Sequence, residues 1–105
     1  MHERAIQMKS EVLKALAQPT RLKILECIRR GERCICEIVP AIHGQQSNIS
    51  RHISVMQKNH LVSTRKDGVR VMVKVKDPTI FDIIDKVSVV LKKQLKEQEQ
   101  ILARI

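Results

Sequence analysis

The chain has 105 residues with one Phe and no Trp or Tyr, and 20 Lys and Arg outnumber 11 Asp and Glu for a net charge of +9. This length fits one domain with a modest core, which must be built from Leu, Ile, Val and Met, as suits packed helices. No apolar run approaches the ~20 residues of a membrane span, and the charged N-terminal segment lacks a secretory pattern. We therefore expect a cytoplasmic protein without a membrane partner, whose three cysteines are thiols rather than structural disulfides.

Helical periodicity dominates the first part of the chain. Apolar side chains recur at three- and four-residue spacing, and Pro19, Gly31 and Gly44 interrupt the pattern. Helices are predicted at about 4–17, 21–30, 34–42 and 45–59.

The periodicity then changes to that of strands. Residues 61–65 and 69–76 alternate apolar with polar side chains, and Asp67-Gly68 between them favours the tight turn of a hairpin. Asp77-Pro78-Thr79 ends the second strand and begins a helix predicted to reach the C-terminus. The expected fold is mainly α with a small β-hairpin, in a single domain over 1–105.

The last helix carries an apolar stripe of ~25 residues, or ~38 Å at 1.5 Å per residue, which is more than so small a domain covers. The stripe consists of Ile80, Ile83, Ile84, Val87, Val90, Leu91, Leu95, Ile101, Leu102 and Ile105. Because an exposed apolar surface of this extent normally has a partner, we expect a homodimer joined by the helices at about 4–17 and 79–105.

Positive charge is concentrated between residues 41 and 76. This window holds seven basic residues and one acid, Asp67, so that six of the nine net charges fall within it. The basic residues are Arg51, Lys58, Arg65, Lys66, Arg70, Lys74 and Lys76. Such a surface is typical of proteins that bind a polyphosphate, although a solvated face has the same appearance.

The helix predicted to begin at Gln45 has a polar start. Its polar residues are Gln45, Gln46, Ser47, Asn48, Ser50, Arg51 and His52. Gln and Asn can pair with adenine and Arg with guanine, while Ile49, Ile53 and Met56 form one buried face. A short helix, a Gly-containing turn, this helix and a basic hairpin together predict a winged helix-turn-helix that reads DNA. A solvent-facing helix with simple caps is the structural alternative.

The hairpin tip would act as the wing. Arg65, Lys66 and Arg70 flank it, where they would reach the DNA backbone or the minor groove. Charges at this place also protect a strand edge from aggregation. Because a dimer doubles the reading unit, the expected partner is double-stranded DNA with an inverted-repeat operator.

The chain resembles the ArsR/SmtB family of winged-helix repressors. The similarity lies in LAQPTRLKIL (16–25), ERCICEI (32–38), QSNISRHISVM (46–56) and the segment 60–75 with RKDGVRV. It implies dimeric repressors whose operator affinity falls when an inducer binds. By position it also implies that Gln46, Ser47, Ser50, Arg51 and His52 face DNA.

Cys34 and Cys36 match the thiolate pair of the arsenic- and cadmium-type branches of that family. Soft ions such as As(III), Cd(II) and Pb(II) prefer thiolate, and a helix N-terminus lowers the pKa of a thiol. Residues i and i+2 of a regular helix point ~200° apart. We therefore expect joint chelation to require unwinding of the first turn.

Other ligand sets of the family are incomplete. Val39 replaces the third cysteine of the arsenic branch, and Cys27 beside Ile24 and Ile28 fits a small core residue better than a third ligand. The zinc-type site would need ligands at Asp77, Thr79, Val90 and Lys93, of which only Asp77 qualifies, and His2, His43, His52 and His60 show no ligand spacing.

Three inducer hypotheses remain open, and no cofactor is required in any of them. A soft metal or metalloid binds Cys34 and Cys36, with Cys27 or an external thiol as a further ligand. Alternatively, these cysteines oxidise and distort the helix start, or no cysteine-based inducer exists. An enzyme is not expected, because no catalytic triad, phosphate loop or carboxylate pair is visible. A soft-metal carrier and a non-specific DNA binder are the remaining alternatives.

Overall fold

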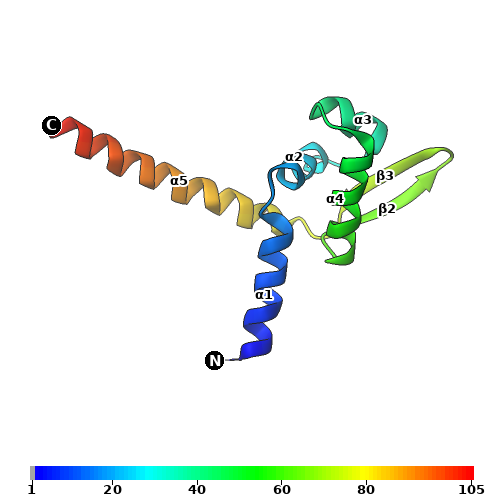
Figure 1. Ribbon diagram of the computed structural model, residues 1–105, viewed down its shortest axis with the longest axis horizontal. Coiled ribbons are helices and arrows are strands. Elements are labelled where there is room, and N and C mark those ends of the chain that lie inside the picture. The colour runs from blue at the N-terminus through cyan, green and yellow to red at the C-terminus, as the bar shows by residue number, and fades with distance from the viewer. Residues whose placement is uncertain (1) are drawn as a thin grey trace.

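The computed structural model describes residues 2–105 as five helices and three strands. The elements are α1 Glu3–Leu16, α2 Pro19–Ile28, β1 Arg33–Cys34, α3 Ile35–Ala41, α4 Gln46–Lys58, β2 Val62–Asp67, β3 Arg70–Val75 and α5 Thr79–Ala103. The predicted order of helices and hairpin is confirmed, and each predicted helix has its counterpart. The fold is a mainly helical winged helix-turn-helix with a small antiparallel sheet (Figure 1).

The core lies between α2, α3, α4 and the sheet. Its fully buried side chains are Ile24, Leu25, Ile28, Cys34, Ile38, Ile49, Met56, Val62 and Val73. Each large apolar side chain that leaves water contributes about 1.5–3 kcal/mol to folding. The inward face predicted for α4 is confirmed, because Ile49, Ile53 and Met56 are all buried. This buried face fixes α4 to the body and leaves its opposite face in solvent.

The turn between α3 and α4 depends on a close approach rather than on a special glycine angle. His43 adopts the left-handed conformation with φ of 52°. Gly44 follows it, and a Cβ at Gly44 would lie 2.6 Å from Cδ1 of Ile49. A larger residue would displace the side chain that anchors the first turn of α4 in the core. The predicted turn at these two residues is thus present, and Ile49 explains why its second residue is glycine.

The sheet contains one strand more than expected. β1 pairs antiparallel with β3, with Arg33 opposite Val73 and Cys34 opposite Met72, so the strand order is β1-β3-β2. A strand of two residues is too short to show alternation, and only its partner in space defines it. This pairing attaches the segment before α3 directly to the hairpin.

The hairpin turn is displaced by one residue from the predicted Asp67-Gly68. Asp67 and Arg70 are the last paired residues, so Gly68 and Val69 form the loop. Gly68 has φ of +63°, as a glycine at the first position of a tight turn often does. Val69 is fully exposed at the tip.

α1 and α5 extend away from the body in different directions (Figure 1). Only the start of α5 is buried, at Ile80 and Phe81, and most of its apolar stripe is exposed. The exposed members include Val87, Val90, Leu91, Leu95, Ile101 and Leu102. Within residues 2–105, no helix, α5 included, combines the length and the apolar sequence needed to cross a membrane.

Candidate DNA interface and cysteine turn

The start of α4 presents polar groups beside the hairpin. Gln45, Gln46, Ser47 and Arg51 are exposed, and Asn48 and Ser50 are partly exposed. The N-cap residue Gln45 makes no side-chain cap hydrogen bond. The first N–H groups of the helix therefore remain available to an acceptor outside the chain, such as phosphate. Arg51 Nη2 donates to Asn48 Oδ1 at 2.8 Å, which holds the guanidinium along the helix surface.

His52 departs from the prediction that it faces DNA. Only 8% of this residue is exposed, and its Nδ1 accepts a hydrogen bond from Nε of Arg21 at 3.1 Å. Burial lowers the pKa of His52, and the charges of Arg21 and Arg51 lower it further. The neutral imidazole therefore packs against α2 and helps to position α4. His52 sits on the inner face because it follows Ile49 by three residues, and we remove it from the candidate DNA-facing set.

The wing arginines are engaged by two glutamates that the sequence did not single out. Nε of Arg65 donates to both carboxylate oxygens of Glu32, at 3.2 and 3.0 Å, and this pairing lowers the pKa of Glu32. Nη2 of Arg70 donates to Oε1 of Glu37 at 3.0 Å. Lys66 lies between them on β2, with an exposed side chain. The hairpin therefore carries exposed positive groups, of which two have carboxylate partners in the isolated chain.

The cysteine pair lies at the junction of β1 and α3. Cys34 is the N-cap of α3 with φ of −70° and ψ of 144°, an extended conformation, and Cys36 belongs to the first turn. Sγ of Cys34 accepts the N–H of Cys36 at 3.0 Å, and the two sulfurs are joined as a disulfide. The expectation of three thiols therefore holds for Cys27 but not for this pair. The prediction that both cysteines lie within the helix was wrong. Because Cys34 stands outside the helix, its side chain is not subject to the ~200° separation of i and i+2 residues.

One surface hollow joins the cysteines to both parts of the candidate interface. It is lined by Cys34, Ile35, Cys36, Gln46, Ser50, Val69, Arg70 and Val71. Cys34 is almost completely buried, whereas Cys36 is exposed. Any group bound to the Cys36 sulfur would therefore lie next to the polar start of α4 and the first residues of β3.

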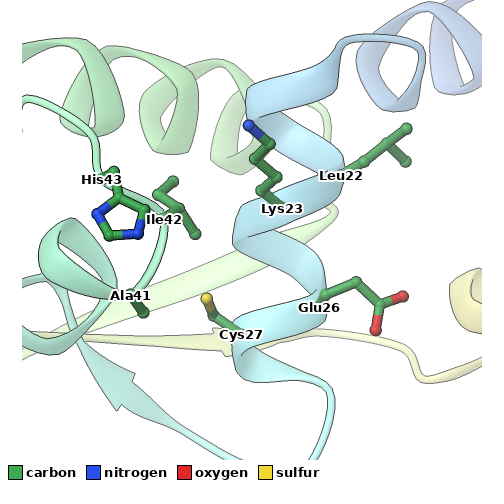
Figure 2. A pocket seen from close by; sticks show the side chains of 7 residues that line it. All are labelled: Leu22, Lys23, Glu26, Cys27, Ala41, Ile42 and His43. Carbon is green, nitrogen blue, oxygen red and sulfur yellow. The ribbon is translucent and has the colours of Figure 1, made fainter.

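Cys27 occupies a different place. It is half-buried, carries a free thiol and packs against the core. Figure 2 shows its sulfur beside Ala41 and Ile42, in a hollow that His43 also lines, at the end of α3 away from Cys34. Across residues 2–105, no three His, Cys, Asp or Glu side chains are grouped so that they would hold a metal ion. Cys27 thus matches the expected packing residue better than a third ligand.

Comparison with known proteins identifies the family. Residues 18–64 match the family described as "Bacterial regulatory protein, arsR family". The arsenical resistance operon repressor of Staphylococcus aureus is 32% identical over 81 residues, which cover 77% of this chain and 78% of that protein. The chain belongs to the arsR family.

Two further comparisons describe the relationship. The probable mercury resistance operon repressor of Streptomyces lividans is 41% identical over 71 residues, which cover 68% of this chain but 57% of that relative's length. The homodimeric winged helix-turn-helix DNA-binding domain of Mb0332 from Mycobacterium bovis superposes with a TM-score of 0.77 at 25% identity, covering 92% of this chain and 93% of that chain. This arsR-family protein is a DNA-binding transcriptional regulator and not an enzyme.

In this arsR-family chain, the local sequence does contain a signal for the role of Glu37. Cys34 and Glu37 occupy the N-cap and N3 positions of a capping box, a spacing usually recognised from Ser or Thr at the N-cap. The pairing of Glu32 with Arg65 spans 33 positions of the sequence and depends on the β-sheet register. No local pattern indicates such a contact.

Proposed function

We propose that this arsR-family protein is a homodimeric repressor that places the start of α4 in the major groove of an inverted-repeat operator. The observation that carries the proposal is the uncapped, polar first turn of α4 beside a basic hairpin, on a helix whose opposite face is anchored by Ile49, Ile53 and Met56. Gln45, Gln46, Ser47, Asn48, Ser50 and Arg51 are the proposed base- and phosphate-contacting residues, with Arg65, Lys66 and Arg70 on the wing.

The exposed apolar faces of α1 and α5 support the dimer. Ile6, Met8 and Leu13 of α1 are exposed, as is most of the stripe on α5. A second copy packed along these helices removes both surfaces from water. Two copies related by a twofold axis would then read half-sites separated by about one helical turn, ~34–36 Å, or a multiple of it.

A binding experiment tests the DNA-reading surface. Duplexes that the protein enriches from a random pool are measured against scrambled versions at fixed salt, with the parent and with Gln46→Ala, Ser50→Ala and Arg51→Ala. Loss of a good base contact should cost ~1–3 kcal/mol of discrimination. Arg30→Ala is the matched control, because it removes one exposed positive charge outside α4. If Arg30→Ala weakens binding as much as Arg51→Ala and the parent shows no sequence preference, the protein is a non-specific binder.

As the inducer we propose a soft metal or metalloid at Cys34 and Cys36. The convergence of the two sulfurs at the N-cap of α3 supports joint ligation without unwinding, and thiolate is the ligand that As(III), Cd(II) and Pb(II) prefer. The names of the arsenical and mercury resistance repressors suggest the same class of ion. Because residues 2–105 offer no three-residue ligand group, an external thiol or a residue of a second copy would complete the coordination.

A redox inducer is the second candidate, and the geometry of the backbone favours it. The Cα atoms of Cys34 and Cys36 lie 5.1 Å apart, within the usual range of a disulfide. Oxidation would remove both thiols from the turn that begins α3. Cys27 lines a different hollow from the one that contains Cys34 and Cys36.

Titration of the reduced protein–operator complex distinguishes the inducers. As(III), Cd(II), Pb(II), Zn(II) and the oxidant diamide are added separately to the parent, Cys34→Ser, Cys36→Ser and the matched control Cys27→Ser. We expect a soft ion to weaken operator binding in the parent and in Cys27→Ser only. A response to diamide alone selects the redox candidate, and no response in the parent contradicts both. Retention of metal affinity without any operator binding identifies a carrier.

A further inference from the structure

The cysteine turn is the segment 34–36 at the start of α3, and Glu37 joins it to the wing through a single carboxylate. Its Oε1 accepts the backbone N–H of Cys34 at 3.1 Å and Nη2 of Arg70 at 3.0 Å, and its Oε2 lies 3.8 Å from Nη2 of Arg33. One oxygen therefore bonds both to the N-cap of α3 and to an arginine on β3. A change in the backbone at Cys34 must move this oxygen or break one of its two bonds.

The sheet keeps these groups together. Cys34 is paired with Met72 of β3, two residues after Arg70 in the same strand. The cysteine turn, Glu37 and Arg70 thus belong to one continuous set of contacts along the sheet. Arg70 also lines the hollow that contains Cys34 and Cys36.

Glu32 and Arg65 form a similar ion pair without this connection. Nε of Arg65 donates to both oxygens of Glu32, which caps no helix. Glu32 and Glu37 therefore carry equal charge, lie on either side of the cysteines and each pair with one wing arginine. Only Glu37 also touches the backbone of the cysteine turn, and this difference provides a matched control within the chain.

We infer that Glu37 is a positioning residue that transmits the chemical state of Cys34 and Cys36 to Arg70 of the wing. While Arg70 is bonded to Glu37, a DNA phosphate must compete with the carboxylate for the guanidinium. Rearrangement of the N-cap shifts Glu37 and so changes how readily Arg70 is released to phosphate. This inference deepens the proposed function, on which its consequence for DNA affinity rests.

The test follows Arg70 directly and needs no DNA. The ¹⁵N–¹H signals of the arginine Nε groups are recorded for protein reduced with a phosphine and for protein oxidised with diamide, in a Cys27→Ser background. The parent is compared with Glu37→Gln, which keeps an acceptor for the cap but loses the charge, with Glu37→Asp, which keeps the charge but shortens the reach, and with Glu32→Gln. Assignment of the Arg70 signal comes from its loss in Arg70→Gln.

The expected result is a shift of the Arg70 signal between the two states in the parent and in Glu32→Gln, and no shift in either Glu37 variant. An Arg70 signal that does not respond in the parent, or that responds equally in Glu37→Gln, overturns the inference. The inference is also overturned if the shift of the Arg70 signal is reduced as much in Glu32→Gln as in Glu37→Gln. Loss of one negative charge alone would then explain the effect.

Operator affinity of the same samples separates this inference from the proposed function. For an exposed ion pair, we expect Glu37→Gln to reduce the ratio of affinities between the two states by about two- to fivefold, with Glu32→Gln unchanged. If the Arg70 signal responds as expected while the parent binds the operator equally in both states, the redox proposal fails and the role of Glu37 stands. If affinity responds but Arg70 does not, the role of Glu37 fails alone.

Discussion

The N-termini of α3 and α4 lie close together in the sequence and are built in opposite ways. α3 begins with a complete capping box, in which Sγ of Cys34 accepts the N–H of Cys36 and Glu37 accepts the N–H of Cys34. α4 begins at Gln45 with no side-chain cap. At the start of α3, side chains accept two backbone N–H groups, those of Cys34 and Cys36. At the start of α4, no side chain caps the backbone donors.

This difference separates two tasks within one helix-turn-helix. An uncapped start costs helix stability but keeps N–H groups for phosphate. A capped start whose cap atoms are a cysteine sulfur and a carboxylate responds to the chemical state of those groups. The comparison suggests that α4 contacts DNA and that the start of α3 controls how it does so.

The largest predicted effect comes from removing the side chain of Ile49, which holds the uncapped start of α4 in place. Ile49 is completely buried at the end of the first turn of α4 and packs against Gly44. Ile49→Ala should lower the free energy of unfolding by about 2–5 kcal/mol, as for other buried large-to-small changes. Urea unfolding measures this. Val69→Ala, at the fully exposed hairpin tip, should stay within about 0.5 kcal/mol of the parent, and an equal loss in both variants would contradict the described core.

The cap of α3 is tested by two changes at Cys34. Cys34→Ala removes the acceptor for the N–H of Cys36 and should cost about 1 kcal/mol of unfolding free energy. Cys34→Ser supplies an oxygen at the same position and should cost less. Thermal unfolding of the reduced proteins compares them. If Ser is no better than Ala, Cys34 does not act as a cap.

Adding a cap to α4 should make the two starts alike. Gln45→Ser provides a short acceptor at the N-cap and should stabilise the protein by roughly 0.5–1 kcal/mol while weakening operator binding, because the N–H groups become occupied. Gln45→Ala removes the same side chain without adding a cap and serves as the control. Tighter operator binding by Gln45→Ser than by Gln45→Ala would contradict the role assigned to the free donors.

The smallest effect concerns the inner side of α4. The pKa of His52 is lowered from its usual 6.5 by burial and by the neighbouring Arg21 and Arg51. Below pH 6.5 the unfolded chain therefore binds a proton that the folded chain does not, so stability should fall as the pH is lowered from about 7 toward 5. In His52→Gln this slope should be shallower, as measured by urea unfolding at each pH. An unchanged slope would show that His52 titrates normally in the folded protein.

The local parts of this architecture were predictable from the sequence. Periodicity located all five helices, and the buried face of α4 followed from Ile49, Ile53 and Met56. Contacts that depend on tertiary structure were not predictable. β1 exists only through β3, His52 meets Arg21 only because α2 and α4 pack together, and Glu32 contacts Arg65 only through the sheet register. The error at Cys34 came from a shift of one residue in the helix start, which changed two diverging side chains into converging ones.

The most direct test of the account is the stoichiometry and selectivity of DNA binding. Analytical ultracentrifugation and a fluorescence titration at fixed salt would be carried out with an enriched duplex and with its scrambled version. We predict two chains on each enriched duplex, about 10³-fold or more tighter binding than to the scrambled one, and loss of that preference in Arg51→Ala. A monomer on DNA, or equal affinity for both duplexes, would contradict it.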